Sequence, residues 1–504
     1  MTTDQPDMDN ARPRRMRKLG VTLFVVAVLL TLLGIFHLIE NWRGKAKWER
    51  LKRELVAKGE QLDLVAFVPP PIPPEQNFAA TPFFAELFPG PKPTNWNDRH
   101  WPEGFLRLNP PTVPGRLRER QMTDMVAWQT LIRGTNGVAG SSEDRAKAAE
   151  AVLAALKPYE PALTELRAAA GRPLSLYGVE YAMDNPWGIR LPHLPVIKEV
   201  ARVLNVKACA ELATGNSERA MEDVRLLARL VHSMDSEIFL INYLVEVAAL
   251  QLMLQPVWEG LALGSWSDAQ LQELQNMLMQ FNFVGHLALP LKAERAAGIL
   301  TVEILMSQRY KVEFIEALTG QQQGGSVGVR NALALLVPRG WYRMEQVEYT
   351  RLSQEFMLPG ADGTNRLVYP ATVDGHQAQL QKALPGGLRA LFQHRMIARL
   401  LMPTVVNVHR RAAEAQTAVH QGAIACALER YRRKHNDYPS ELAALAPEFM
   451  AGSPHDVIGG KPMHYKPGKP VVIYSVGWDE KDNGGTPGKT LWHEQGDWVW
   501  TYPQ

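Results

Sequence analysis

The chain has 504 residues, of which 46% are hydrophobic and 21% are charged, and both values are ordinary for globular proteins. The formal net charge is only +3, and much of the basic excess flanks one apolar segment, so we expect no nucleic-acid partner. Cys209 and Cys426 lie far apart in Ala-rich segments. We expect them to be small buried thiols, and a single disulfide between them is the alternative.

The first informative element is an apolar segment at residues 19–39, which has 21 residues without a formal charge. At 1.5 Å per residue it is long enough to cross a hydrocarbon layer of about 30 Å. The tail 1–18 before it is basic, and the segment runs directly into Glu40-Asn41-Trp42-Arg43. A cleavable signal peptide would have a shorter apolar region and a small-residue cleavage site. The sequence therefore predicts an uncleaved signal-anchor that places the chain in a lipid bilayer.

The flanking charges do not decide the orientation of this anchor. Six basic residues also follow it, and they are mixed with acidic ones: Arg43, Lys45, Lys47, Arg50, Lys52 and Arg53. Long domains can cross a membrane whatever their charge. Residues 40–61 show helical spacing with i,i+4 ion pairs and predict a charged stalk.

Residues 62–118 are rich in proline, with 13 of the 36 prolines lying between Pro69 and Pro114. Proline at this density predicts extended, partly polyproline backbone. Six aromatic residues are interleaved with the prolines, so we expect the segment to pack against other elements rather than form a free linker: Phe78, Phe83, Phe84, Phe88, Trp96 and Trp101.

Residues 119–402 predict an α-helical body. Ser141 to Asp144 should cap an Ala-rich helix, and four further helices are expected at 194–214, 217–232, 236–263 and 267–282. The short connections between these four predict antiparallel neighbours. The spacing of small residues at 210–220 resembles a tetratricopeptide hairpin, but no second clean copy follows at a fixed period.

The stretch 238–254 is apolar enough to suggest a second membrane span. Asn242, Glu246 and Gln251 lie within it, and polar side chains are costly in a bilayer. We therefore predict a buried core helix there.

Residues 403–504 predict a compact α+β domain. A long helix from 404 to about 435 should end at Asn436 in a left-handed cap, and a short second helix should follow at 440–446. Strand patterns then occur at 462–466, 471–476 and 497–502, which together predict a three-stranded antiparallel sheet. The whole chain is thus expected to be mostly α.

This domain resembles the globular domain of the major pseudopilin of type II secretion. The resemblance rests on the order and spacing of several short motifs over about the last 100 residues: Leu428-Glu429-x-Tyr431, Tyr438-Pro439, Pro454-x-Asp456, Tyr474-Ser475-Val476-Gly477-x-Asp479 and Gly484-Gly485. The whole chain also resembles single-pass bacterial envelope proteins that have no assigned activity. Both resemblances imply that the N-terminus is cytoplasmic and the bulk of the chain is extracytoplasmic, anchored in the inner membrane.

The sequence departs from a pseudopilin in where its anchor lies. A pseudopilin carries its membrane segment at the start of the long helix, whereas here the anchor ends at Ile39 and that helix begins near Thr404. The family's glutamate five residues after the prepilin cleavage site would be Val25, with Gly20 before the cut. We therefore expect neither processing nor assembly into a fibre.

The resemblance also implies a calcium site. The family binds calcium in the loop before the last strand, and the residues that map onto it here are Asp479 and Asp497, with Asp482 as a further candidate. Carboxylates and loop carbonyls are suitable oxygen ligands for this ion. Glu480 stands where the family usually has glycine, and an acidic turn without an ion is the alternative.

No motif for catalysis is present. The local groupings of histidine are His455-Asp456, His493 with Glu494 and Asp497, and His409 with His420, and none matches a spacing with a known mechanism. We therefore expect a non-enzymatic envelope protein that makes protein–protein contacts, linked to secretion-type assemblies. The alternative is an envelope enzyme with an unrecognised site in the helical body. A deep pocket with converging polar groups would favour the enzyme.

Overall fold

The computed structural model describes residues 11–88, 117, 121–133, 145–181, 186–307, 337–402, 407–489 and 495–502. These residues are mostly helical and include a small three-stranded antiparallel sheet near the C-terminus, as the sequence predicts. They form two compact units. One comprises residues 1–62, 298–352 and 384–401, and the other comprises 63–297, 353–383 and 402–504. We describe each unit separately.

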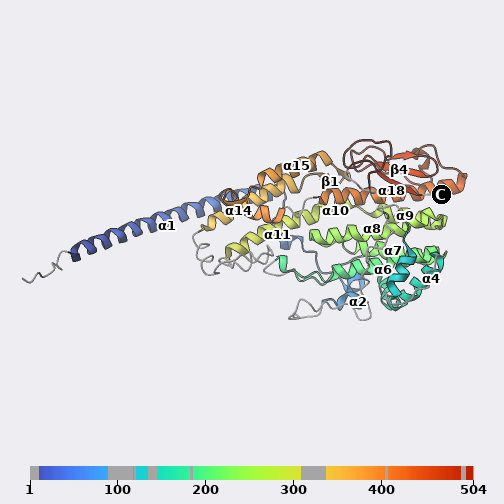
Figure 1. The fold of residues 1–504 in the computed structure, drawn as a ribbon, viewed down its shortest axis with the longest axis horizontal. Helices are drawn as coiled ribbons and strands as arrows, with labels where there is room; N and C mark the ends of the chain where they lie inside the picture. Colours follow the sequence, from blue (N-terminus) through green and yellow to red (C-terminus); the bar gives the residue numbers. More distant parts are fainter. Residues whose placement is uncertain are drawn as a thin grey trace, which may run out of the picture. The chain divides into compact units, whose positions relative to one another are not determined.

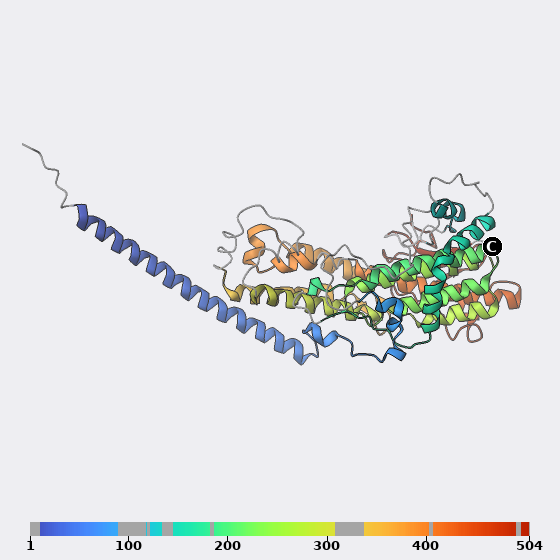
Figure 2. The ribbon, with the colours of Figure 1, turned by 90° about the horizontal axis from the view of Figure 1, so that it is seen from below.

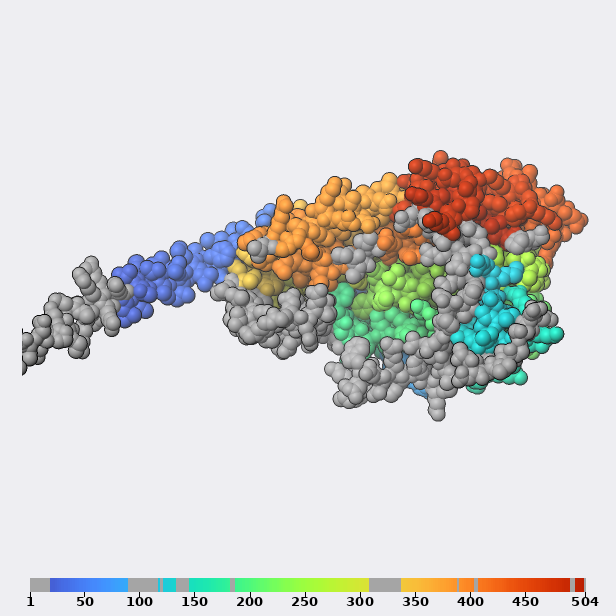
Figure 3. Space-filling view, viewed as in Figure 1, coloured from blue at the N-terminus to red at the C-terminus, as the bar shows by residue number. Residues whose placement is uncertain are grey.

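The first unit is built around α1, a single helix that runs from Ala11 to Ala57. The expected membrane segment and the expected stalk are therefore one continuous helix (Figures 1 and 2). The apolar stretch of α1 is exposed: the most hydropathic window of the helix has a mean hydropathy of 2.7 and none of it is buried (Figure 3). The other helices of this unit are the C-terminal part of α11 (Ala288–Ser307), α14 (Arg339–Leu352), α16 (Gly387–Phe392) and α17 (Met396–Leu401).

Helix α14 packs along the second half of α1, as Figure 1 shows. Two glycines allow the helices to touch backbone to backbone. A Cβ atom on Gly340 would lie 1.9 Å from the carbonyl oxygen of Glu40, and one on Gly44 would lie 2.2 Å from the carbonyl oxygen of Gly340. Hydrogen bonds reinforce the crossing, since Asn41 Oδ1 accepts one from the Gly340 amide at 2.7 Å.

The helical part of the second unit follows the predicted pattern closely. Its main helices are α6 (His193–Ala213), α7 (Ser217–His232), α8 (Leu240–Ala262) and α9 (Asp268–Gln280). Helices α6, α7 and α8 pack on one another across short connections, as expected for antiparallel neighbours. The fourth helix, α9, packs instead mainly on α18 (Val408–His435). Ser267 and Gln270 form a reciprocal capping box at the start of α9. Helix α8 is buried over 67% of its most apolar window, which confirms the prediction of a core helix.

Shorter elements complete this unit. They are α3 (Met125–Arg133), α4 (Arg145–Leu156), η5 (Lys157–Tyr159), α5 (Glu160–Ala169), η6 (Pro186–Gly188), α10 (Phe283–His286), η7 (Ser353–Met357), the strands β1 (Ala361–Asp362) and β2 (Leu367–Val368), and α15 (Pro370–Ala383). The expected cap at 141–144 lies outside the described residues. Cys209 and Cys426 are buried and free, as predicted.

The described part of the proline-rich segment consists of short turns packed against the helical body. The turns are η1 (Leu64–Phe67), η2 (Pro74–Gln76), η3 (Phe78–Ala80) and α2 (Pro82–Ala85). Phe78, Phe83 and Phe84 are buried, and the Phe84 ring meets Tyr177 edge to face. The expectation that these aromatics pack is confirmed for these three, whereas Trp96 and Trp101 lie outside the described residues.

The C-terminal part contains α18 (Val408–His435) and the sheet β3-β4-β5, whose strands are His464–Lys466, Val471–Ser475 and Trp498–Tyr502. Both pairings are antiparallel, with Ile473 opposite Trp500. The sheet packs on α18 (Figure 1), and Asn436 ends the helix with a φ of 58°, as predicted. The expected helix 440–446 is a single 3₁₀ turn, η9 (Leu442–Leu445), which lies between Pro439 and Pro447.

Candidate functional site

The three aspartates predicted to bind calcium lie in one loop, and each accepts hydrogen bonds from the backbone of that loop. Asp497 is completely buried at the start of β5, where Oδ1 accepts from the Asn483 amide at 3.1 Å and Oδ2 from the Gly485 amide at 2.6 Å. Burial raises the pKa of Asp497 above its ordinary value, and these two backbone donors oppose the rise.

Asp482 and Asp479 cap shorter turns of the same loop. Asp482 Oδ1 accepts from the Gly484 amide at 2.8 Å, which lowers the pKa of this exposed carboxyl. Asp479 Oδ2 accepts from the Gly496 amide at 3.3 Å. Glu480 has a φ of 58°, a left-handed backbone that glycine adopts most readily.

These carboxylates do not converge on one point. Among the described residues, the one group of three or more His, Cys, Asp or Glu side chains with ligand atoms within 4.8 Å of one another lies elsewhere. The calcium site stays a prediction.

That other group consists of Asp235, Glu246 and His286, and it lies in the helical body. Asp235 is in the turn after α7, Glu246 is on α8, and His286 ends the short helix α10. His286 Nδ1 lies 3.6 Å from Asp235 Oδ1 and 3.6 Å from Glu246 Oε1. We call these three residues the DEH cluster.

The DEH cluster joins a buried carboxylate to two side chains that reach the surface. The side chain of Glu246 is 3% exposed, whereas those of Asp235 and His286 are 34% and 36% exposed. Burial raises the pKa of Glu246 to about 7. The nearby Glu246 carboxylate raises the pKa of His286 above its ordinary value. Asp235 Oδ1 and His286 Nδ1 are nevertheless buried atoms without a hydrogen-bond partner.

The residues around the DEH cluster hold it in place. His232, at the end of α7, donates from Nδ1 to Asp235 Oδ2 at 3.1 Å, and its ring stacks on Phe281 with centroids 4.3 Å apart. The Tyr243 hydroxyl donates to the Phe283 carbonyl at 2.9 Å and so ties α8 to α10.

Sequence reasoning missed this cluster for a physical reason. Its three members are up to 51 positions apart and come from three elements, and no single helix face or loop brings two of them to ligand spacing. The sequence offers a hint in Glu246, a carboxylate within an otherwise apolar helix, which we interpreted only as a sign of a buried core helix. A buried carboxylate needs a partner, so the residue also predicted one somewhere in the fold.

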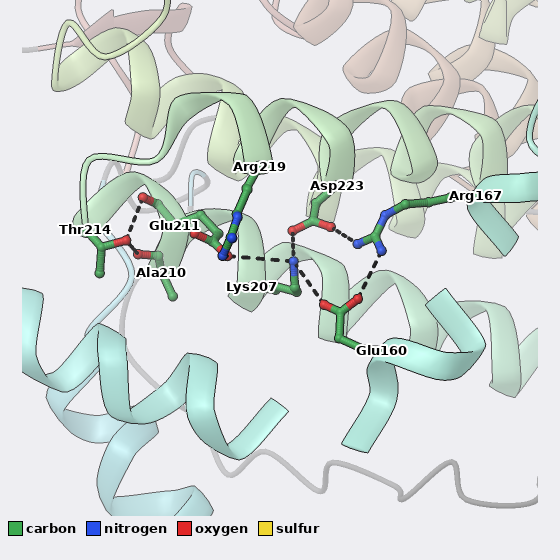
Figure 4. Close-up of polar contacts among 8 residues, drawn as sticks. All are labelled: Glu160, Arg167, Lys207, Ala210, Glu211, Thr214, Arg219 and Asp223. Atoms are coloured by element: carbon green, nitrogen blue, oxygen red, sulfur yellow. Dashed lines mark hydrogen bonds and ion pairs between the residues drawn. The ribbon is translucent and has the colours of Figure 1, made fainter. Parts of the chain in front are cut away.

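A second charged cluster in the helical body has a structural role (Figure 4). Asp223 is buried and accepts from Lys207 at 3.0 Å and from Arg167 at 2.6 Å. Glu160 pairs with the same two cations, at 3.3 and 3.1 Å, and so closes a ring of alternating charge. The ring ties α5, α6 and α7 together, and Glu211 extends it, since its carboxylate lies 3.8 Å from Lys207 and 4.0 Å from Arg219.

The histidine groupings noted in the sequence are packing residues where the structure describes them. His420 is buried, contacts Gln416 at 2.9 Å and the His455 carbonyl at 3.1 Å, and its pKa is lowered by burial to about 4. Asp456 accepts from the Ser475 hydroxyl and the Val476 amide, which fixes the start of the loop after β4. His493 and Glu494 lie outside the described residues.

Comparisons with known proteins leave these features without a counterpart. No protein-family model matches the chain, and neither a curated protein nor a solved structure matches it.

Proposed function

We propose that this chain is a single-pass protein of the inner membrane of a bacterial envelope, with the bulk of its mass outside the cytoplasm. The observation that carries the proposal is the exposed apolar stretch of α1. Leu23, Phe24 and Leu30 are each 60–69% exposed on it. So many exposed apolar side chains in sequence are unfavourable in water and favourable in a lipid bilayer.

The end of the apolar stretch has the features of a membrane boundary. The ring of Trp341, on α14, meets Phe36 edge to face at 6.3 Å, and its indole nitrogen donates to Glu40 at 3.1 Å. Trp42 follows on α1 and is 74% exposed. Tryptophan side chains gather at the interface between lipid and water because they are apolar with one polar group.

Further exposed apolar residues in the same unit lie beside Trp341. Phe392, at the end of α16, is 66% exposed and packs against Trp341 with centroids 6.1 Å apart. Arg389 and Arg395 flank it in the sequence. An aromatic side chain with neighbouring arginines suits contact with lipid headgroups.

We infer that the helical body and the C-terminal domain make protein–protein contacts in the envelope, of the kind found in secretion-type assemblies. The long helix α18 with its three-stranded sheet supports a pseudopilin-like domain in outline. The alternative is an envelope enzyme in the helical body, and the DEH cluster is the observation that favours it, since it brings three polar side chains together near the surface.

The orientation is tested by fusing a phosphatase directly after Gln504 and, in a matched chain, by fusing there a fluorescent reporter that matures only in the cytoplasm. We expect an active phosphatase and a dark fluorescent reporter. The reverse result would show that the basic residues after the anchor hold the body in the cytoplasm. If the full-length chain were soluble with both fusions, the result would contradict membrane anchoring itself.

The protein-contact role is tested by cross-linking the chain in intact cells and identifying its neighbours by mass spectrometry. The control is the same chain with the segment 404–504 deleted. We expect the full-length chain to cross-link to a small set of envelope proteins and the shortened chain to lose these cross-links. The same cross-linked proteins with both chains would contradict a binding role for the C-terminal domain.

We also propose that calcium binds the loop containing Asp479, Asp482 and Asp497. Carboxylates and the carbonyls of a glycine-rich loop are oxygen ligands of the kind that calcium prefers. A ligand that binds only the folded state stabilises it by about 2.7 kcal/mol at 100 times its Kd. The chain should therefore melt several degrees higher in millimolar calcium than in chelator, magnesium should substitute poorly, and Asp479→Ala should abolish the difference. Identical melting in calcium and chelator would identify the loop as an acidic turn.

A further inference from the structure

We propose that Asp235, Glu246 and His286 form a binding site for a divalent transition-metal ion, with zinc as the ion that fits the donor set best. The site is independent of the calcium loop and of the membrane anchor. The zinc site does not depend on either proposal, and it would stand if the calcium site or the membrane anchor were disproved.

The spacing of the three side chains is the first argument. An ion bound tetrahedrally at 2.0–2.2 Å holds its ligand atoms about 3.3–3.6 Å apart. The structure places His286 Nδ1 at 3.6 Å from an oxygen of Asp235 and at 3.6 Å from an oxygen of Glu246. These distances are too long for good hydrogen bonds and suit atoms that share one ion.

The unsatisfied atoms are the second argument. Asp235 Oδ1 and His286 Nδ1 are buried and have no hydrogen-bond partner, although they lie 3.6 Å from each other. The side chain of Glu246 is 3% exposed, and its carboxylate lies 3.6 Å from His286 Nδ1. A cation between the three atoms would satisfy all of them at once and would compensate the burial of Glu246.

The surrounding contacts fit a metal ligand set. His232 donates to Asp235 Oδ2, which leaves Oδ1 to face His286 and Glu246. Hydrogen bonds of this kind orient the ligands of metal sites and hold their geometry. His286 would bind through Nδ1 with its proton on Nε2, at the partly exposed edge of the ring.

The donor atoms indicate the kind of ion. An imidazole nitrogen favours zinc and other late transition metals over magnesium and calcium, which prefer oxygen alone. Three protein ligands leave a fourth position, and the one-third exposure of Asp235 and His286 gives water access to it. Such an open position is typical of zinc sites that exchange or activate a ligand and not of closed structural sites.

The test uses the full-length chain, purified in detergent and stripped of metal with a chelator. Zinc is then titrated in competition with a chromophoric chelator, and the bound metal is counted after gel filtration. We expect one tightly bound zinc per chain. Cobalt in its place should give the visible absorption of a four-coordinate site, because this readout reports ligand geometry directly.

The variants separate this site from surface binding. Glu246→Gln and His286→Gln should each weaken zinc binding by about 100-fold or more, and His232→Gln should weaken it by about 10- to 100-fold as a positioning residue. His435→Gln, which changes an exposed histidine on α18, is the control and should bind as the unaltered chain does. Because His286 is partly exposed, its variant should fold even if the variant of buried Glu246 does not. No bound zinc in the unaltered chain, or equal binding by the folded His286→Gln chain, would overturn the proposal.

Discussion

Two helices of this protein are long and apolar enough to cross a membrane, and they have opposite environments. The apolar stretch of α1 has a mean hydropathy of 2.7 and is not buried at all, whereas that of α8 has 1.4 and is 67% buried. The difference lies in the polar residues. Residues 19–39 carry no charge, while α8 contains Asn242, Glu246, Gln255 and Glu259, all of them buried.

Each buried polar group of α8 needs partners, and several of these partners come from distant segments of the chain. The Glu259 carboxylate accepts from the Thr123 amide at 2.8 Å and pairs with Arg145 at 2.6 Å. Gln255 donates to the Gln121 carbonyl at 3.0 Å. The comparison teaches that hydropathy alone marks an apolar helix, and that the side chains interrupting it decide whether lipid or protein surrounds it.

The largest expected effect comes from placing one charge in each helix. Leu250→Asp replaces a completely buried apolar side chain with a carboxylate, and we expect the second unit to lose its cooperative fold. Leu29→Asp changes a residue that is 60% exposed, and we expect unchanged melting of that unit but weaker membrane insertion, by about 3 kcal/mol. Protease resistance measures the first effect and extraction with alkaline carbonate the second. If Leu250→Asp left the second unit as resistant to protease as in the unaltered chain, α8 would not be a core helix of that unit.

The next effect concerns the partners of Glu259. Glu259→Leu leaves Arg145 and the Thr123 amide without an acceptor, and breaking a buried ion pair on one side costs about 3–5 kcal/mol. Denaturant unfolding of the solubilised chain measures the loss. Glu49→Leu on the exposed face of α1 is the control and should change stability little. A loss of less than 1 kcal/mol for Glu259→Leu would mean that these partners do not hold α8 in the protein interior.

The pH dependence of stability tests the buried contact between Glu294 and the first residue of α8, Leu240. Glu294 on α11 accepts a hydrogen bond from the Leu240 amide, and burial raises the pKa of Glu294 to about 7. The folded state therefore holds its proton more tightly than the unfolded state, whose carboxyl has a pKa near 4.5. This contribution to stability is complete below about pH 4.5 and is lost as the pH rises through about 7, with a magnitude on the order of 3 kcal/mol.

The variant Glu294→Gln keeps an acceptor for the Leu240 amide but cannot ionise. We expect its melting temperature to change less between pH 5 and pH 8 than that of the unaltered chain, and to be the higher of the two at pH 8. Parallel pH profiles for the two chains would show that Glu294 is already ionised in the folded state.

The smallest effect concerns the place where α1 meets α14. Gly340→Ala puts a Cβ atom 1.9 Å from the Glu40 carbonyl oxygen, so the helices must separate, at a cost of about 1–3 kcal/mol. Gly375→Ala on α15 is the matched control, since nothing lies within 4 Å of its Cβ, and it should stabilise its helix by up to about 1 kcal/mol. Limited proteolysis of the solubilised chain measures how strongly each variant protects the first unit from cleavage. Equal resistance in the two variants would argue against close packing of α14 on α1.

Local patterns in the sequence were sufficient to predict most elements of the fold. The helices 217–232 and 267–282 were predicted nearly to the residue because Ser217 and Ser267 begin them and apolar periodicity fills them. The three C-terminal strands and the left-handed cap at Asn436 followed from β-branched runs and turn residues. These signals act between neighbours in the chain, so no knowledge of the tertiary structure was needed.

Only the tertiary structure decided which distant residues meet. The sequence alone determined that residues 19–39 are an uncharged apolar helix and that α8 carries polar groups that need partners. It did not determine that Asp235 and His286 lie beside Glu246, or that Gly340 lies against Glu40, because such contacts depend on how elements 11 to 300 residues apart pack. The candidate metal site arises from that packing, which carries no local sequence signal.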